Sequence, residues 1–469
     1  ITAPENVAWL LNIRGKDNPN SPIPNSRVII TKDKKIYFFS DSSKIKKIKK
    51  DKDFKKITFK EDKDFFSVIS LLKGKSFLID LLSCSIFFET LIHSKFNLIN
   101  DIDPCYFLKS IKNRKEIENT KKAHRFDGAA LTKFLFWAKV KNKKRISELD
   151  AEKKLEMFRR KNKNYLYPSF STIAGSGPNG AIIHYRVNKK SNRIIKKNDI
   201  FLCDSGGQYK YGTTDVTRTI CFRKPNIRVK NIFTRVLKGH IAVANTNLDR
   251  LNKGYQIDKR ARHYLNQINL DYSHGTGHGV GFFLNVHEGP QSLSKYNYIP
   301  IREGMFLSNE PGYYEENKFG IRIENLVYVK KKRNNLMFEN FTFAPIDKDK
   351  DEQAPKKNGK YQTVLSKKDL NSWINKIKKS KAFAIDTETD SVQTVSANML
   401  GISLSVAENE GCYIPIGHDY EGCPEQLSMD EVITVLGPVI EENQDKIVGQ
   451  NLKFDIPILS RHGINITKF

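Results

Sequence analysis

Short apolar runs alternate with charged segments over the first hundred residues. The stretch "RVIITKDKKIYFF" (27–39) places two apolar runs around a charged turn, which predicts two strands. "SFLIDLLSCSIFFETLI" (76–92) predicts a strand followed by a helix. This pattern is typical of a small α/β domain, and it contains no combination of residues that indicates catalysis.

The pattern then changes to helix. Residues 106–150 are predicted to be mainly helical, because apolar side chains recur at helical spacing in "EIENTKKAHRFDGAALTKFLFWAKVK". The residues with this spacing are Ala123, Phe126, Ala130, Leu131, Phe134 and Trp137.

Strand-like segments begin near residue 170. They are "STIAGSGPNGAIIHY", "DIFLCDSGGQY", "DVTRTICF", "GMFLSNEPGYY" and "FGIRIENLVYV", and the helical stretch "NIFTRVLKGHIAVANTNLD" divides them. Residues 345–360 are polar and charged without apolar period, which is typical of a linker. A new α/β pattern starts at Tyr361.

Length and cysteine content narrow the class of protein. A chain of 469 residues is long enough for two to four domains. The six cysteines are scattered without a CxxC pair, which argues against a disulfide framework or zinc ribbon and favours a reducing, cytoplasmic location. No apolar run reaches about 18 residues, so we expect no membrane span. The chain starts without Met, and we expect it to lack an N-terminal part.

Charge is high and unevenly distributed. The net charge is +28, and the run 44–56 could be a nucleic-acid patch or a lysine-rich solvated surface. The second interpretation is favoured, because 60 Lys accompany only 20 Arg and phosphate-binding surfaces favour the arginine fork. Residues 361–469 carry a net charge of −5 against +33 for the remainder, which indicates domains of different origin.

One strand places a carboxylate among threonines. In "TTDVTRTI", Asp215, Thr217 and Thr219 share one strand face, where an unpaired carboxylate is costly to bury and a metal ion would remove that cost. Further candidate ligands occur in ordered glycine-rich motifs: Asp204, His274, His278, His287, Glu310 and Glu324. Two Asp, two Glu and one His would form a hard ligand set suited to a pair of divalent ions, Mn²⁺ or another first-row metal. Such a pair would generate a nucleophile near neutral pH.

A second group of acids lies in the last hundred residues. Asp386 and Glu388 in "FAIDTETDS" point to one side of a predicted strand, and Asp455 lies at a predicted helix start. This combination suits two-metal phosphodiester hydrolysis, although solvent-facing acids at a strand end would look the same.

The ordered motifs "TIAGSGPNGAIIHY", "LCDSGGQY", "GTTDVTRT", "HGTGHGVG", "VHEGP", "NEPGYY" and "GIRIEN" resemble the pita-bread metallopeptidases, most closely the aminopeptidases P. The resemblance implies a multidomain α/β and α+β protein. It would consist of a creatinase-like non-catalytic domain (1–105), a pita-bread catalytic domain (106–346) and a linker or junction (347–360).

The same resemblance implies roles for individual residues. Asp204 would bind one metal, Asp215 and Glu324 would bridge, and His278 and Glu310 would complete the second metal. His184, His274 and His287 would be catalytic histidines on the substrate side, which hold the scissile carbonyl and proline region and stabilise the oxyanion or move protons. Arg322 would hold Asp204, although a surface charge is an equal alternative.

Residues 361–469, with "DTET", "SANMLGISLSV", "YIPIGHDY" and "VGQNLKFD", resemble the 3′–5′ proofreading exonuclease domain of bacterial DNA polymerase I. That resemblance implies a ribonuclease-H-like fold in which Asp386, Glu388 and Asp455 are three of four metal-binding acids, with Mg²⁺ as the possible ion. The fourth acid would lie beyond Phe469, so we expect an incomplete, inactive domain.

Two functions follow from these patterns. The first is a dinuclear-metal aminopeptidase that releases the N-terminal residue from Xaa-Pro peptides. For this enzyme we expect a cytoplasmic location, and a homodimer is possible. The alternative is a DNA-processing protein with weak nucleic-acid binding through 361–469, or an artificial or misassembled fusion of the two parts. We expect no membrane partner.

Overall fold

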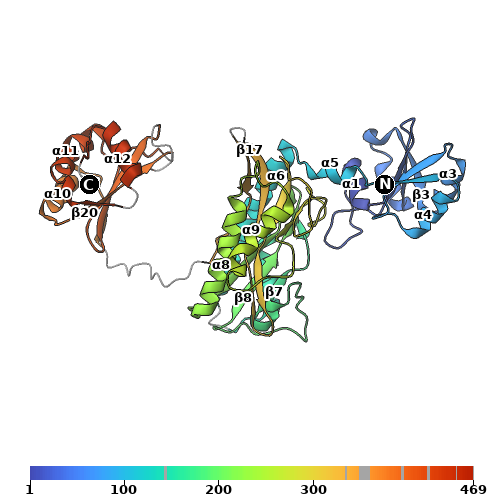
Figure 1. Cartoon of the computed structure of the whole chain (residues 1–469), viewed down its shortest axis with the longest axis horizontal. Coiled ribbons are helices and arrows are strands. Elements are labelled where there is room, and N and C mark those ends of the chain that lie inside the picture. The colour runs from blue at the N-terminus through green and yellow to red at the C-terminus, as the bar shows by residue number, and fades with distance from the viewer. Residues whose placement is uncertain are drawn as a thin grey trace. The chain divides into compact units, whose positions relative to one another are not determined.

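The computed structural model describes residues 1–141, 145–332, 335–347, 360–391, 396–419, 423–449 and 452–467. The chain divides into two compact units, Ile1–Asp349 and Lys350–Phe469 (Figure 1). The division falls in the predicted linker 347–360, of which 348–359 lie outside the described residues. Both described ends of that linker belong to folded structure: Asp347 accepts a hydrogen bond from Cys221 N (3.0 Å), and Lys360 begins strand β19 (Lys360–Thr363).

The first hundred residues form the predicted α/β region. The two strands predicted in 27–39 are confirmed as the antiparallel pair β1 (Arg27–Ile30) and β2 (Ile36–Ser40), and β3 (Ile57–Glu61) joins β2 in parallel. A second parallel pair consists of β4 (Ser76–Ile79) and β5 (Asn97–Asn100). The helices of this region are α1 (Pro4–Leu10), α2 (Ser42–Ile48), α3 (Phe65–Leu71), α4 (Ile86–His93) and α5 (Cys105–Ser110).

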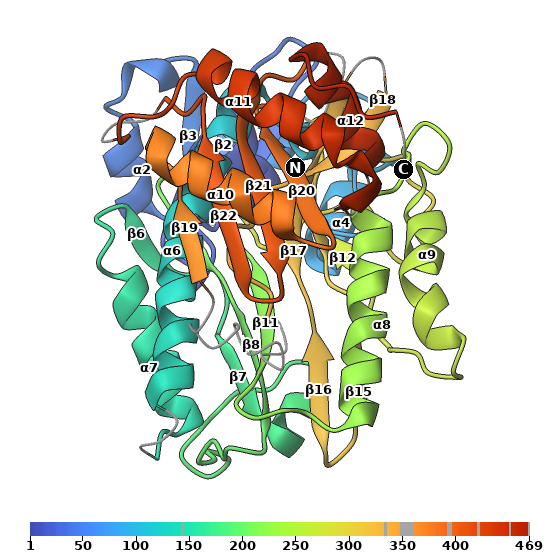
Figure 2. The same ribbon diagram turned by 90° about the vertical axis from the view of Figure 1, so that its left-hand side faces the viewer.

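Two long helices cover one side of the central strands in residues 106–346. These helices, α6 (Arg114–Lys141) and α7 (Glu148–Arg159), lie beside the antiparallel sheet β11-β8-β7 (Figure 2). Its strands are β7 (Ile173–Ser176), β8 (Ile200–Ser205) and β11 (Val216–Cys221). Phe134 of α6 is fully buried against Phe201 of β8. Phe126 is off this buried face: it is 47% exposed and stacks on Tyr211.

On the other side of these strands lie α8 (Ile227–Ala244) and α9 (Gly254–Asn266), which pack on each other (Figure 2). The helix predicted near 231–249 is thus confirmed, whereas α9 was not predicted. The remaining strands of this unit are β6 (Tyr165–Pro168), β9 (Gly207–Tyr209), β10 (Gly212–Thr213), β12 (Gly277–His278), β13 (Ser292–Leu293), β14 (Phe306–Asn309), β15 (Gly312–Glu315), β16 (Phe319–Arg322), β17 (Asn325–Lys332) and β18 (Asn335–Asn340). The whole is the mixed α/β architecture expected for a pita-bread domain.

Strand β11 is buried on both faces, so its side chains contact other parts of the domain on each side. Thr217 and Thr219 face the carboxylates that were predicted to bind metal, whereas Arg218 lies on the opposite face and is 1% exposed. Its guanidinium donates to the backbone carbonyls of Glu324 (2.5 Å), Ala344 (2.7 Å) and Pro345 (3.0 Å). Carbonyl acceptors satisfy this buried cation and fix the chain after β18 against the sheet.

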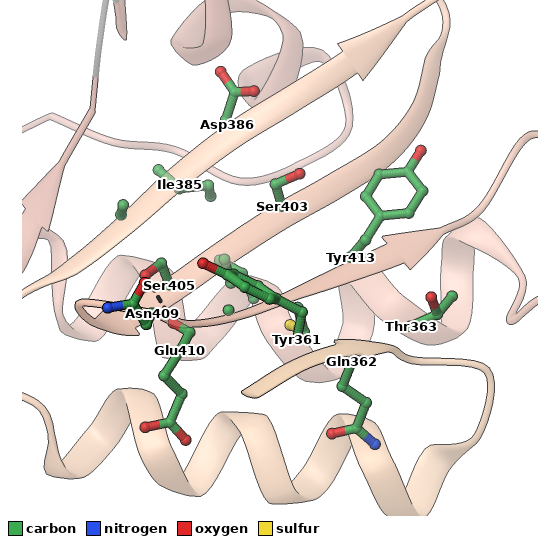
Figure 3. Close-up of a pocket in the computed structure, with 14 residues that line it drawn as sticks. Tyr361, Gln362, Thr363, Ile385, Asp386, Ser403, Ser405, Asn409, Glu410 and Tyr413 are labelled. Atoms are coloured by element: carbon green, nitrogen blue, oxygen red, sulfur yellow. Dashed lines mark hydrogen bonds between the residues drawn. The ribbon is translucent and has the colours of Figure 1, made fainter. Parts of the chain in front are cut away.

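The second unit is a five-stranded sheet in the order β19-β22-β21-β20-β23. The strands after β19 are β20 (Phe383–Thr389), β21 (Met399–Ala407), β22 (Glu410–Pro415) and β23 (Ile447–Val448), and the helices are α10 (Lys367–Lys379), α11 (Met429–Glu442) and α12 (Leu452–Arg461). Trp373 and Ile377 of α10 are buried in its core. Figure 3 shows Asp386, Ser403 and Tyr413 on neighbouring strands, pointing to one side of the sheet along a groove of about 460 Å³.

None of the helices in the described ranges combines the length and the apolar character that a membrane crossing requires.

Candidate metal site

The five predicted ligands come from five separate segments. Asp204 lies in β8 and Asp215 lies one residue before β11, and these strands are antiparallel neighbours with Thr217 opposite Asp204. His278 ends β12, Glu310 follows β14, and Glu324 lies between β16 and β17.

The structure brings these side chains together. Ligand atoms of Asp215, His278 and Glu324 all lie within 4.8 Å of one another. His278 Nε2 is 3.3 Å from Asp215 Oδ2 and 3.3 Å from Glu310 Oε1. His278 Nδ1 donates to Gly279 O (2.9 Å), which directs Nε2 toward the carboxylates. In the described part of the chain, this is the one group of three or more candidate ligands that meets so closely.

The electrostatics of the cluster favour a bound cation. Burial raises the pKa of Asp215 well above its usual value, and the charges of Asp204 and Glu310 add to this effect. Burial and the charge of Asp215 likewise raise the pKa of Glu324 well above its usual value, and burial raises that of Glu310. Crowded buried carboxylates of this kind are costly without a compensating positive charge.

One oxygen atom of Asp204 also indicates that a bound cation is needed. Its Oδ2 accepts a hydrogen bond from Arg322 Nη2 (2.7 Å), but its Oδ1 is buried without a hydrogen-bond partner. A buried carboxylate oxygen without a partner is rare in folded proteins. The hard oxygen and imidazole donors therefore fit divalent metal ions.

Arg322 is held beside the carboxylates rather than at the surface. Its side chain is 2% exposed, so the alternative of a surface charge is wrong. Besides Asp204, it donates through Nε to Thr217 Oγ1 (3.2 Å) and through Nη1 to Tyr314 OH (2.5 Å). Thr217 Oγ1 in turn donates to Glu324 Oε2 (2.7 Å). Arg322 thus connects two of the predicted ligands through one hydrogen-bond network.

Tyr314 is a member of this network that the sequence did not reveal. Burial raises the pKa of its phenol to about 12. His274 Nδ1 donates to Gly275 O (2.7 Å), so its Nε2 accepts from Tyr314 OH (2.8 Å). The only available signal was the position of Tyr314 in "NEPGYY", four residues after Glu310.

The three predicted substrate-side histidines differ in burial. Burial is the main cause that lowers the pKa of His274 to about 3. His287 is exposed, its ring centre lies 4.1 Å from that of His278, and this neighbour lowers its pKa to about 4. His184 is also exposed, and it contributes to lowering the pKa of both His274 and His287, which places it near them.

The acids of the second unit are arranged differently. Asp386 and Glu388 are exposed on one face of β20, whereas Asp455 is 2% exposed. Asp455 Oδ1 accepts hydrogen bonds from Thr387 N (2.8 Å) and Thr387 Oγ1 (2.7 Å). Burial, Asp455 and Glu388 raise the pKa of Asp386, so the three acids are near one another. They nevertheless do not form one of the close ligand groups found among the described residues.

Comparison with known families agrees with this geometry. Residues 118–331 match the model of metallopeptidase family M24. The matched region, residues 118–331, is named the M24 domain for this similarity. Residues 1–116 match the creatinase/prolidase N-terminal domain, and residues 361–469 match a 3′-5′ exonuclease family.

Curated relatives resemble the M24 part and the region before it. A probable Xaa-Pro aminopeptidase P of Laccaria bicolor is 40% identical over 368 residues, which cover 74% of this chain and 57% of the relative. Aminopeptidase P2 of Arabidopsis thaliana is 38% identical over 391 residues, which cover 74% of this chain and 55% of the relative. The chain therefore spans little more than half the length of these relatives.

Solved structures show the same fold. An X-prolyl aminopeptidase of Caenorhabditis elegans, described as a cytosolic enzyme with a di-nuclear active site, aligns with a TM-score of 0.64 and 29% identity over 79% of this chain and 62% of that one. An Xaa-Pro dipeptidase of Bacillus anthracis aligns with a TM-score of 0.61 over 74% of this chain and 92% of that one, and its 23% identity supports the fold alone.

Proposed function

We propose that the M24 domain is a dinuclear-metal aminopeptidase that removes the N-terminal residue from peptides with proline at the second position. The observation that carries the proposal is the convergence of Asp215, His278 and Glu324 within 4.8 Å, with Asp204 and Glu310 beside them. The C. elegans enzyme with a di-nuclear active site supports two metals, and the aminopeptidase P relatives support the Xaa-Pro substrate.

In this proposal the five ligands hold two divalent ions, most simply Mn²⁺. Asp204 would hold one ion, His278 and Glu310 would hold the other, and Asp215 and Glu324 would serve both. Bound ions of this type polarise a scissile carbonyl and supply a nucleophile at neutral pH. Arg322 orients Asp204 through its hydrogen bond to Oδ2, and Thr217 fixes one oxygen of Glu324.

The histidines then act on the substrate. A pKa of about 4 keeps His287 neutral at pH 7, so its exposed ring offers one N–H donor to a developing oxyanion or to the peptide. His274 is neutral as well, and Tyr314 and Gly275 O hold its ring in place. The exposed ring of His184 would contact the substrate from the segment after β7.

Domain roles follow from the same proposal. Residues 1–105 form a non-catalytic domain, 106–346 the catalytic domain, and 361–469 a separate exonuclease-like domain without nuclease activity. Mg²⁺ would be the ion for Asp386, Glu388 and Asp455 if that domain bound one. We also propose a cytoplasmic location and a homodimer.

The test is hydrolysis of an Xaa-Pro-Xaa tripeptide by the whole chain, with and without added Mn²⁺. We expect metal-dependent release of the first residue and no release from a matched peptide with alanine in place of proline. Asp215→Asn should abolish the activity, whereas Glu316→Gln, a change of an exposed carboxylate in the turn between β15 and β16, should not. Equal hydrolysis in the presence of a chelator would refute a metallopeptidase.

A further inference from the structure

The loop that connects His278 to His287 has a constrained backbone. Within it, Phe283 has a φ of +49°, a left-handed conformation that a bulky side chain rarely adopts. Two hydrogen bonds close the loop on itself, from Gly281 N to Asn285 O (2.9 Å) and from Glu288 N to Gly279 O (2.8 Å). Such a conformation persists only where the surroundings hold it, and it is often connected with function.

One support comes from the creatinase-like region. Arg14 donates through Nε to Phe283 O (2.6 Å) and through Nη2 to Phe282 O (3.3 Å). Its Nη1 donates to Ala8 O (3.1 Å), at α1, and to Ile13 O (2.9 Å). Burial lowers the pKa of Arg14 to about 10, yet it stays charged at neutral pH. The same cation therefore joins the strained turn to a region outside the catalytic domain.

Apolar packing extends this support. Leu284, the residue after Phe283, is 1% exposed and packs in one cluster with Ala8 and Ile23. Gln208 Nε2 donates to the carbonyls of Leu284 (2.8 Å) and Asn20 (3.1 Å). The turn is thus enclosed by residues from before position 25 on one side and by β9 on the other.

The other end of the loop is held by buried charge. Glu288, next to His287, accepts from Lys112 Nζ (2.5 Å) and lies 3.3 Å from Lys109 Nζ. The side chains of all three are 1% exposed. Removing one partner of a buried ion pair leaves an uncompensated charge, so this contact strongly fixes the position of Glu288.

We propose that Arg14 and the Lys112–Glu288 pair are positioning residues for the loop between His278 and His287. Through this loop they fix the position of His287 beside the predicted metal ligands. Neither contact reaches the predicted ligands directly, and both attach the loop to the segment that precedes α6. The creatinase-like region would then complete the active site by shaping this loop. This inference rests on the proposed aminopeptidase function for its catalytic consequence, but not for its structural part.

The experiment compares Arg14→Gln and Glu288→Gln with the unchanged chain, in full length and loaded with Mn²⁺. The matched control is Arg27→Gln, which removes an arginine of the same region whose ion pair with Asp62 lies at the surface. Three quantities are measured: hydrogen exchange of the Gly281 and Glu288 amides, Mn²⁺ content, and kcat and KM for an Xaa-Pro tripeptide.

We expect faster exchange at both amides, unchanged metal content and a kcat lowered by about tenfold or more, because a small displacement of a catalytic group has large kinetic cost. Arg14→Lys should restore part of kcat, and Arg27→Gln should match the unchanged chain. Unchanged exchange in both variants, or faster exchange with unchanged kcat, overturns the proposal; if Arg14→Gln does not fold, Glu288→Gln decides alone. An unchanged chain inactive on the tripeptide refutes the proposed function, and the exchange rates then still decide whether these residues hold the loop.

Discussion

Both units carry a group of acids that the sequence predicts to be metal ligands, but the two groups differ in their burial. In the M24 domain the acids are buried and converge from distant segments on His278. In the second unit Asp386 and Glu388 are exposed on one strand, and Asp455 accepts a hydrogen bond from Thr387. Burying several carboxylates together is costly unless a cation is bound, whereas exposed acids need no such ion. Burial therefore distinguishes a candidate metal centre from an acidic strand end better than residue type does.

Replacing a buried acid should give the largest effect. We expect Glu324→Gln to lower kcat/KM by about 10³-fold and to reduce the metal content measured by mass spectrometry, because Glu324 would bridge both ions. In the metal-free protein the same change should raise the melting temperature, since it removes one of several repelling charges. Glu316→Gln is the exposed control and should change neither value.

A change at a substrate-side histidine should be smaller and of another kind. His274→Ala is expected to lower kcat by about 10²-fold and to leave the metal content unchanged, if the ring stabilises the transition state. Loss of metal in this variant would instead make His274 a ligand.

A pH experiment tests whether burial of ionisable groups is costly away from the site as well. His124 is buried, stacks on Phe341, and burial lowers its pKa to about 4 from the usual 6.5. The folded state favours the neutral ring, so this contribution to stability is present above pH 6.5 and is lost as the pH falls toward 4. Between pH 7 and 5 the unchanged chain should lose about 2 kcal/mol more unfolding free energy than His124→Phe. Denaturant unfolding at both pH values measures it, and parallel losses would contradict this assignment.

The smallest effect is expected in the second unit. A 3′-labelled single-stranded oligonucleotide with Mg²⁺ should remain intact, and Asp386→Ala should not alter this result. Digestion by the purified chain that disappears in Asp386→Ala would show a working nuclease and remove the contrast between the two groups of acids.

Local pattern predicted much of this fold, and its failures have physical causes. Alternation in 27–39 and helical spacing in 116–141 predicted their elements correctly. Helix α9 was missed because its fully apolar buried positions are only Ile257, Ala261 and Leu265 among polar residues. Helical spacing alone did not reveal that Phe126 is exposed, because its ring stacks on Tyr211 instead of packing on the buried face of the helix.

For the site, ordered motifs indicated which residues to consider but not their contacts. The sequence left two alternatives for Arg322, because a strand face does not say what lies opposite it. The hydrogen bonds to Asp204 and Tyr314 depend on strands brought together only by folding. Tyr314 was missed for the same reason, because a tyrosine after a glycine has many possible structural uses.

Asp347 has a mechanical consequence for a chain that continues past the M24 domain. Arg218 bonds both to the Ala344 and Pro345 carbonyls and to the backbone of Glu324, so tension along the chain could displace a proposed ligand. Asp347 binds Lys139 and Cys221 N on the downstream side of those carbonyls. A pull from beyond residue 347 must break these two contacts before it strains Arg218. We therefore expect Asp347 to protect Glu324 from tension that arises beyond residue 347.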